Sequence, residues 1–132
     1  MKIAIDMDNT IIDELGSTLR PGIINFLDKI SVENEIILWT NSKRIRTIEI
    51  IDYFNLRKYF FKIISRENYD PNDEGLRKDI GKYDYDILID DDISEIEHTI
   101  KNNKIGILVE SYRKNKQMNE NELDEIIKKY KL

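Results

Sequence analysis

The sequence predicts a doubly wound α/β fold, in which a mainly parallel sheet of about five strands has helices on both faces. Five short apolar runs, rich in isoleucine and leucine, alternate with segments of helical character. Each run is continuously apolar rather than alternately apolar and polar, which is typical of strands that are buried on both faces. Alternation of strands and helices along the whole chain indicates one layered α/β unit with right-handed crossovers.

The predicted strands lie at residues 3–5, 36–39, 60–64, 87–89 and 105–109. Two polar stretches, residues 65–75 and residues 113–121, are predicted to be loops because they are rich in turn-forming and charged residues. The chain has 132 residues, which suits one core, so we expect a single domain over residues 1–132.

The helical segments have recognisable starts. Pro21 fits the first turn of one helix, where proline is favoured. Ser42 is predicted to cap the next helix, whose apolar side would carry Ile45 and later residues at three-residue spacing. Ser94, with a glutamate three residues further on, resembles a capping box for a third helix. The last predicted helix covers about residues 119–130.

Composition excludes several classes of protein. The net charge of −5 and the scattered tyrosines give no strong nucleic-acid signal. The absence of cysteine excludes a disulfide framework and a thiolate zinc site, and it fits a cytoplasmic setting. No segment is long and apolar enough for a membrane span, and the first apolar run is too short for a signal peptide. We therefore expect a cytoplasmic protein without a membrane partner.

Polar side chains follow three of the predicted strands, at the point where each strand ends. Asp6 and Asp8 follow the first strand, Thr40 and Asn41 follow the second, and 90–92 is a run of three aspartates. Because the carboxyl ends of parallel strands share one edge of a sheet, these groups can converge. Converging carboxylates need a cation, and oxygen ligands without histidine or cysteine select magnesium.

The order of these groups resembles the haloacid dehalogenase (HAD) superfamily. An Asp-x-Asp-x-Thr motif at residues 6–10 is followed by Thr40, by Lys78 in a short predicted helix, and by the acidic pair at 90–91. A finer likeness is to the capless branch of phosphatases that are NLI-interacting-factor-like and related to those acting on the RNA polymerase C-terminal domain. The matching stretches are residues 19–22, 26–27, 38–42, 65–67, 77–80 and 87–91. The resemblance implies a three-layer Rossmann-like core without a cap domain.

The resemblance also implies a role for each motif residue. Asp6 would be the nucleophile that forms an aspartyl-phosphate, and Asp8 would be the general acid and base. Thr40, Asn41 and Lys78 would bind the phosphoryl group. The Mg²⁺ ligands would be Asp6, the Asp8 backbone carbonyl and Asp91, with Asp90, Asp92 and Glu95 in reserve. Which of the three consecutive aspartates binds the metal is left open, although alignment of the strand ends favours Asp91.

The spacing of the motifs leaves no room for a cap. Asp8 and Thr40 are 32 positions apart, and Thr40 and Lys78 are 38 apart, which a helix and a strand already fill. An uncapped site is open, so the phosphorylated substrate can be a macromolecule. The substrate stays open among phosphoprotein, nucleic-acid end, nucleotide and sugar phosphate, and so does the oligomeric state. Basic residues that could line the mouth of the site are Arg20, Lys43, Arg44 and Arg46.

The sequence therefore predicts a Mg²⁺-dependent phosphomonoesterase with an aspartyl-phosphate intermediate. The alternative is a receiver-like or non-catalytic phosphate-binding signalling domain. Receiver domains carry their acceptor aspartate on a middle strand and their acidic pair on the first strand, whereas Asp6 follows the first strand here. Asp8 also argues against a switch, because an acid two residues after the nucleophile speeds hydrolysis of the aspartyl-phosphate.

Overall fold

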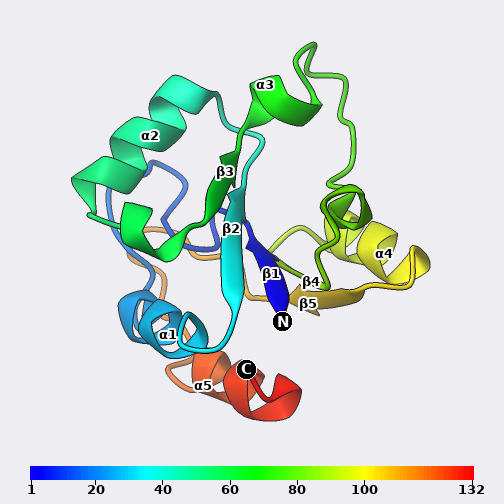
Figure 1. Ribbon diagram of the computed structural model, residues 1–132. Coiled ribbons are helices and arrows are strands. Elements are labelled where there is room, and N and C mark those ends of the chain that lie inside the picture. The colour runs from blue at the N-terminus through cyan, green and yellow to red at the C-terminus, as the bar shows by residue number, and fades with distance from the viewer.

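The computed structural model describes all 132 residues, which form a five-stranded sheet with helices on both faces (Figure 1). All four strand pairings are parallel, and the strand order is β3-β2-β1-β4-β5. The strands are β1 (Lys2–Ile5), β2 (Glu35–Trp39), β3 (Lys62–Ile64), β4 (Ile87–Asp90) and β5 (Ile105–Leu108). The chain starts at the centre of the sheet, builds one side, and then crosses back to build the other. The predicted α/β fold is confirmed.

The reversal of strand order places β1 beside both β2 and β4. Ile5 is aligned with Ile89 in the register of β1 and β4, so the residues that follow these strands emerge side by side. Crevices at such a reversal, outside the carboxyl ends of the strands, are where ligands bind in open α/β sheets. The topology therefore brings the acids that follow β1 and β4 to one place.

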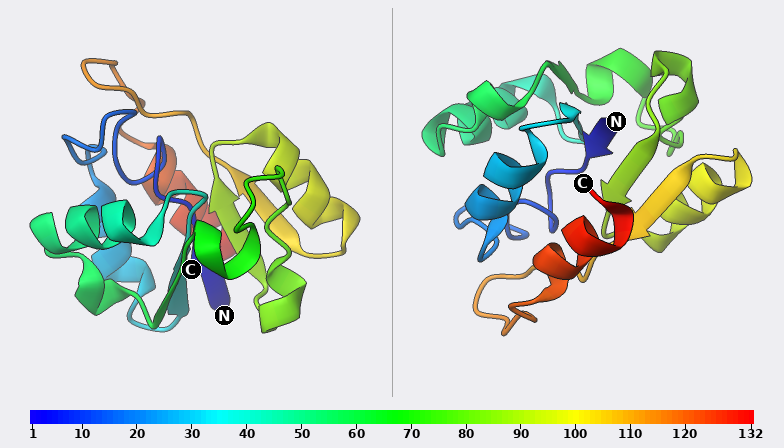
Figure 2. Two further views of the ribbon diagram at one scale, coloured as in Figure 1. Left: turned by 90° about the horizontal axis from the view of Figure 1, so that it is seen from above. Right: turned by 60° about the horizontal axis from the view of Figure 1, so that its bottom comes forward.

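Helices cover the two faces of the sheet in separate groups. α1 (Ile23–Ile30) and α5 (Glu122–Tyr130) lie side by side on one face (Figure 2), and α2 (Arg44–Tyr53) packs into the same core. α4 (Ile93–Lys101) covers the other face, together with the 3₁₀ helix η2 (Ile80–Tyr83). None of the helices has the length and apolar character needed to cross a bilayer.

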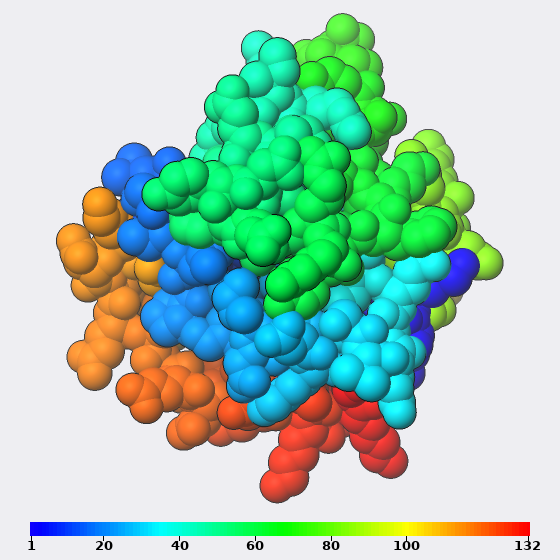
Figure 3. Space-filling model, turned by 60° about the vertical axis from the view of Figure 1, so that its left-hand side comes forward, coloured from blue at the N-terminus to red at the C-terminus, as the bar shows by residue number.

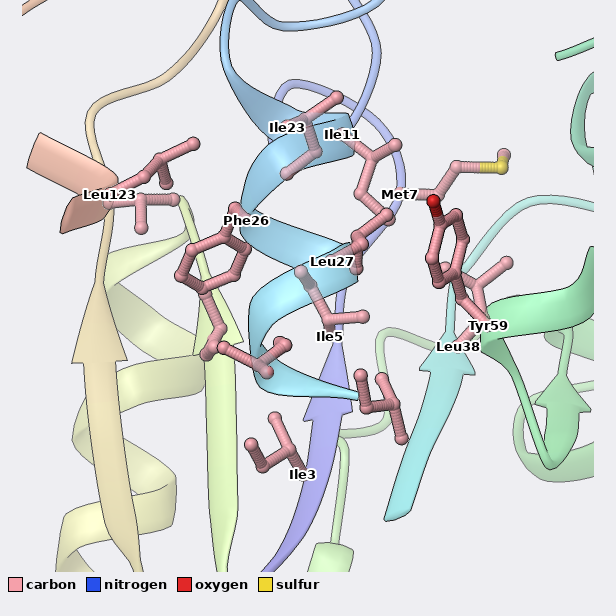
Figure 4. Packing of buried hydrophobic residues seen from close by; sticks show 14 of the residues in the cluster. Ile3, Ile5, Met7, Ile11, Ile23, Phe26, Leu27, Leu38, Tyr59 and Leu123 are labelled. Atoms are coloured by element: carbon pink, nitrogen blue, oxygen red, sulfur yellow. The ribbon is translucent and has the colours of Figure 1, made fainter. Parts of the chain in front are cut away.

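The larger core lies between the sheet and the group of α1, α2 and α5. Ile3 and Ile5 point from β1 into this core, where Phe26 and Leu27 of α1 cover them and Leu123 of α5 closes one side (Figure 4). Neighbouring strand residues point to opposite faces of a sheet. The side chains on both faces of the sheet are buried, which explains why the strands are continuous apolar runs in the sequence rather than alternating patterns.

The smaller core lies under α4 and contains Trp39, which is fully buried. The rings of Tyr69 and Tyr83 meet the Trp39 ring edge to face, with centroids 5.4 and 5.2 Å away. The Trp39 indole N–H has no hydrogen-bond acceptor. Gly106 of β5 lets α4 approach closely, since a Cβ at that position would lie 2.9 Å from Ile96 Cγ2 and 3.0 Å from the Ile96 carbonyl oxygen.

Two predicted helix starts are wrong in detail. Lys43, not Ser42, occupies the N-cap position of α2, and its side chain makes no capping hydrogen bond. The predicted apolar side of this helix is only partly right, because Ile51 is buried as expected whereas Ile45 is 76% exposed and Thr47 is buried. Ser94 lies inside α4, because Asp92 is the N-cap and its carboxylate accepts a hydrogen bond from the Ser94 N–H at 2.8 Å.

Other boundaries differ because short helical turns replace predicted loop or strand residues. The 3₁₀ helix η1 (Arg57–Tyr59) leads into β3, so residue 60 is not in a strand and Phe61 is exposed. The predicted loop at 65–75 contains the one-turn helix α3 (Arg66–Tyr69), which a capping box of Ser65 and Asn68 starts. Pro21 precedes α1 rather than joining it, because Gly22 has left-handed backbone angles.

The loop after β1 and the segment after β5 lie side by side on the surface (Figure 3). Asn9 and Tyr112 exchange two hydrogen bonds, from the Tyr112 N–H to the Asn9 carbonyl at 2.8 Å and from the Asn9 amide to the Tyr112 carbonyl at 2.9 Å. The Lys114 N–H donates to the Glu14 carboxylate at 3.1 Å. These bonds fix the loop that begins directly after the second aspartate of the motif.

Replacing Gly106 with alanine should destabilise the fold. The added methyl group would collide with the backbone of α4, and overpacking of this kind costs about 1–3 kcal/mol. Gly81→Ala is the matched control, because a Cβ there meets its nearest atoms at an ordinary 3.6 Å. Urea unfolding should therefore show a lower midpoint for Gly106→Ala and a change within about 0.5 kcal/mol for Gly81→Ala. Equal midpoints for both variants would contradict the close packing of α4 on β5.

Candidate active site

The acids and the threonine predicted from the sequence meet at the carboxyl edge of the sheet. The Asp6 N–H donates to the Ile89 carbonyl at 3.0 Å, which continues the pairing of β1 with β4. The Thr40 N–H donates to the Ile64 carbonyl at 2.9 Å, which continues the pairing of β2 with β3. A cavity of about 310 Å³ opens there, lined by Asp6, Asp8, Asn9, Thr40, Asn41, Tyr69, Gly75, Leu76, Arg77, Lys78, Asp90, Asp91, Asp92 and Glu95.

A buried ion cluster forms the floor of this cavity. The Lys78 ammonium lies 2.7 Å from Asp6 Oδ1 and 2.7 Å from Asp90 Oδ2. All three residues are buried. Lys78 is not in a helix, contrary to the prediction, because it lies in the irregular segment before η2. Buried charges are costly unless they are paired, so this triad fixes the segment around Lys78 against the ends of β1 and β4.

Burial and mutual interaction shift the pKa values in the cluster. Burial raises the pKa of Asp6 well above its ordinary value; Lys78 opposes this shift, and the nearby charges of Asp90 and Asp91 reinforce it. Burial disfavours the charge on Lys78, but the two carboxylates beside it outweigh burial and raise its pKa. Lys78 therefore stays protonated at neutral pH. Its single positive charge is shared by Asp6 and Asp90.

The charge balance of the cluster fits a divalent cation. Carboxylate oxygens of Asp6, Asp90 and Asp91 lie within 4.8 Å of one another. When all three are ionised, these carboxylates against one ammonium leave an excess of two negative charges. The donors are all hard oxygens, which suit Mg²⁺. The residues present therefore fit the ion that the sequence predicts.

Hydrogen bonds separate the roles of the three consecutive aspartates. Both Asp90 oxygens are in use, one with Lys78 and the other accepting the Asp92 N–H at 3.0 Å. The Asp92 carboxylate caps α4. The Asp91 carboxylate has one polar contact, from the Thr10 hydroxyl at 3.2 Å, and unlike that of Asp92 it lies within 4.8 Å of the Asp6 and Asp90 carboxylates. This arrangement favours Asp91 as the metal ligand among the three.

Two residues brace the cluster from outside. The Thr10 hydroxyl lies 3.1 Å from Asp6 Oδ2 as well as 3.2 Å from Asp91 Oδ1, so it bridges the two carboxylates. Glu95 accepts the Lys78 backbone N–H at 3.0 Å and the Arg77 guanidinium at 3.1 Å. Glu95 thus holds the segment that carries Lys78, and both of its oxygens are occupied. This bracing role was not predicted, because the sequence offered Glu95 only as a reserve metal ligand.

Thr40 is free to donate a hydrogen bond into the cavity. Its side-chain oxygen accepts the Ser42 N–H at 3.1 Å, and its hydroxyl proton has no acceptor in the protein. Asn41 lines the same side, and its backbone carbonyl accepts the Arg66 guanidinium at 2.9 Å. A fully buried hydroxyl with a free proton is suited to an anionic oxygen.

The four basic residues expected at the mouth have different surroundings. Arg20 is buried and forms an ion pair with Glu122 of α5, so it does not line the cavity. Lys43 and Arg44 are exposed at the start of α2 and do not line the cavity either. Arg46 makes a two-point ion pair with Asp8, at 2.9 and 3.2 Å. The sequence did not predict that pair, because it depends on the phase of α2. Arg77, the neighbour of Lys78 in the sequence, does line the cavity.

Removing the Lys78 charge should destabilise the protein strongly. Lys78→Met keeps the apolar length of the side chain but leaves Asp6 and Asp90 buried without a counter-charge. Loss of one partner from a buried ion cluster costs about 3–5 kcal/mol. Lys82→Met, at an exposed lysine without an ion pair, is the control and should change the free energy of unfolding by less than about 0.5 kcal/mol. Urea unfolding at pH 7 would measure both, and equal stabilities would show that the triad is not what holds this segment.

The motif resemblance is supported by comparison with known families. The model of the family described as NLI interacting factor-like phosphatase matches residues 2–131. No individual curated protein matches the chain. The match spans nearly the whole sequence and includes every residue of the ion cluster. The chain therefore belongs to the NLI interacting factor-like phosphatase family, a capless HAD-type group related to the phosphatases of the RNA polymerase C-terminal domain.

Proposed function

We propose that the chain is a Mg²⁺-dependent phosphomonoesterase that forms an aspartyl-phosphate on Asp6. The observation that carries the proposal is the buried Asp6 carboxylate, 2.7 Å from the Lys78 ammonium on the floor of the cavity. An anionic nucleophile is repelled by the negatively charged phosphoryl group that it attacks. A fixed cation beside the nucleophile offsets this repulsion. Phosphoryl transfer depends mainly on such positioning and charge neutralisation.

In the first step, a carboxylate oxygen of Asp6 attacks phosphorus and the bond from phosphorus to the ester oxygen breaks. The protonated Asp8 carboxyl gives its proton to the departing oxygen, which leaves as an alcohol. The free Thr40 hydroxyl proton donates to a phosphoryl oxygen, and the Asn41 side chain borders the same part of the cavity. Lys78 balances the charge that gathers on the phosphoryl group.

In the second step, water attacks the phosphorus of the aspartyl-phosphate. The Asp8 carboxylate takes a proton from that water, the bond from phosphorus to Asp6 breaks, and inorganic phosphate leaves. Asp6 is then a carboxylate again and Asp8 is protonated for the next cycle. The division of roles needs Asp8 to remain outside the ion cluster, and it makes no contact with Lys78.

The metal would be held by carboxylate oxygens of Asp6 and Asp91 and by the Asp8 backbone carbonyl. When bound, Mg²⁺ would neutralise charge on the phosphoryl oxygens and orient them. The other three acids have different partners: Asp90 accepts from the Lys78 ammonium and Asp92 caps α4. Glu95 accepts the backbone N–H of Lys78.

We infer that the substrate carries an accessible phosphate ester and can be macromolecular. The chain between β1 and β2 contains one loop and α1, and the chain between β2 and β3 contains α2 and η1. α1 and α2 both pack into the core, so neither covers the cavity. Phosphoprotein, nucleic-acid end, nucleotide and sugar phosphate all fit this description.

Hydrolysis of p-nitrophenyl phosphate should require both Mg²⁺ and Asp6. Asp6→Asn removes the nucleophile without changing its size, and loss of a nucleophile lowers kcat by about 10³-fold or more. Asp124→Asn, at an exposed acid on α5, is the matched control and should keep wild-type turnover. Chelation with EDTA should abolish turnover, and Mg²⁺ should restore it.

Two results would contradict this proposal. Undiminished turnover by Asp6→Asn would mean that another group is the nucleophile. No turnover by the wild type with Mg²⁺, across aryl phosphate, nucleotide, sugar phosphate and phosphopeptide, would favour the receiver-like or binding alternative. Mass spectrometry of the chain treated with acetyl phosphate would then show whether Asp6 keeps a stable phosphoryl group.

Mg²⁺ binding should depend on Asp91 but not on Asp92. Asparagine caps helices about as well as aspartate, so Asp92→Asn should preserve α4 and keep the ion. Asp91→Asn replaces one anionic ligand and should weaken Mg²⁺ binding at least about tenfold, in the range typical of lost metal-site interactions. Titration calorimetry with MgCl₂ would measure both variants. A larger loss in Asp92→Asn would reassign the ligand.

A further inference from the structure

We propose that Arg46 is a positioning residue that holds the Asp8 carboxyl group in the orientation in which it can give its proton to the leaving oxygen. The proposal rests on the function proposed above. Arg46 Nη2 lies 2.9 Å from Asp8 Oδ1, and Nη1 lies 3.2 Å from Asp8 Oδ2. Two parallel contacts between a planar guanidinium and a carboxylate fix the plane of the carboxylate as well as its position.

Asp8 needs such a partner because of where it lies. It is in the loop after β1, and its side chain is about one-third exposed, at 32%. No other residue pairs with its carboxylate, whereas Asp6 is held by both Lys78 and Thr10. A carboxylate without a partner at this depth would sample several rotamers. A proton donor must be within hydrogen-bond reach of the oxygen that it serves, so loss of orientation lowers the rate.

Arg46 is itself fixed by the residues that follow β2. Its Nη1 donates to the Ser42 hydroxyl at 2.8 Å, and the Ser42 N–H donates to Thr40 Oγ1 at 3.1 Å. A continuous series of contacts therefore links Thr40 to Asp8 through Ser42 and Arg46. The series connects the hydroxyl proposed to hold the phosphoryl group with the carboxyl group proposed to protonate the leaving oxygen. Their relative position is set by the first turns of α2.

The loop after β1 supports Arg46 from the other side. Gly16 lies so close that a Cβ there would be 3.3 Å from Arg46 Nη2 and 2.8 Å from Ile50 Cδ1. Gly16 has a φ of +71°, which favours glycine. The buried Asp13 carboxylate holds the turn by accepting the Leu15 N–H at 2.8 Å and the Ser17 N–H at 3.0 Å. The side chain of Arg46, which belongs to α2, therefore lies against the loop after β1.

Stability alone does not account for this ion pair. Arg46 and Asp8 are 40% and 32% exposed, and ion pairs exposed to this degree contribute little to folding. Arg46 also does not line the cavity, although Asp8 does. The contact between Arg46 and the cavity lining therefore runs through Asp8. The geometry favours positioning of Asp8 over direct substrate binding.

The test compares two substrates that differ in their need for a proton. p-Nitrophenolate leaves readily without protonation, whereas the alkoxide of an alkyl phosphate such as glycerol phosphate does not. For an enzyme with a covalent intermediate, kcat/KM reports the step in which the leaving group departs. Arg46→Ala should lower kcat/KM for glycerol phosphate by about 30- to 100-fold, the scale of a misplaced catalytic group. The loss for p-nitrophenyl phosphate should be less than about fivefold, since that ester needs little proton transfer.

Two further variants separate orientation from charge. Arg46→Lys keeps the charge but gives one contact point, so it should fall between wild type and Arg46→Ala on glycerol phosphate. Arg44→Ala removes an exposed cation from the same helix turn and should match wild type on both substrates. Full restoration of activity by Arg46→Lys would overturn the two-point orientation. Unfolding midpoints equal to wild type would exclude loss of structure as the cause.

Three results would overturn the role of Arg46 without touching the proposed function. Equal losses on both substrates would indicate general damage to the site, and no loss on either would show that Asp8 orients itself. A rise in KM with unchanged kcat would indicate that Arg46 leaves Asp8 and binds the substrate. Failure of the phosphatase proposal has a different signature, because the wild type would then be inactive or Asp6→Asn would be active.

Discussion

The ammonium group of Lys78, buried between Asp6 and Asp90, is the interaction on which the site depends. It joins three parts of the chain: the end of β1, the end of β4, and an irregular segment with no strand or helix to hold it. A charge in this position would be prohibitive without partners at hydrogen-bond distance. Glu95 completes the arrangement by accepting the backbone N–H of Lys78, so the cation is fixed at both its head and its base. The sheet positions Asp6 and Asp90, and their ion pairs with Lys78 hold the irregular segment before η2 against the ends of β1 and β4.

The same cluster is assembled before any substrate arrives. For the phosphatase activity proposed above, its donors and charges would already face the phosphoryl group, and little reorganisation would be required during reaction. The two unmatched negative charges make the cluster incomplete by itself, which is why a divalent cation suits it. Apolar residues at such a strand end are often as stabilising as a buried ion cluster, but they would have no electrostatic reason to bind either metal or phosphate.

The sequence predicted the sheet and the cluster better than it predicted the helices. Continuous apolar runs identify strands that are buried on both faces, and the parallel arrangement then brings the acids together regardless of local detail. The buried side of a helix is harder to predict, because tertiary packing rather than spacing alone selects it. In α2, Ile51 is buried as the spacing predicts, whereas Ile45 is exposed and Arg46 faces Asp8. The Arg46 contact therefore could not be predicted from spacing, since the two residues are 38 positions apart and belong to different elements.

The hydrogen bonds between Asn9 and Tyr112 have a consequence for how the protein is made. β1 leaves the ribosome well before its neighbour β4, and Lys78 follows Asp6 by 72 residues. The loop that carries Asp8 is secured only when Tyr112, 103 residues after Asn9, has emerged. Contacts between such distant residues form slowly and late. During synthesis, Asp6 thus emerges long before Lys78 and Asp90 complete its ion cluster, and the Asn9–Tyr112 contact forms later still.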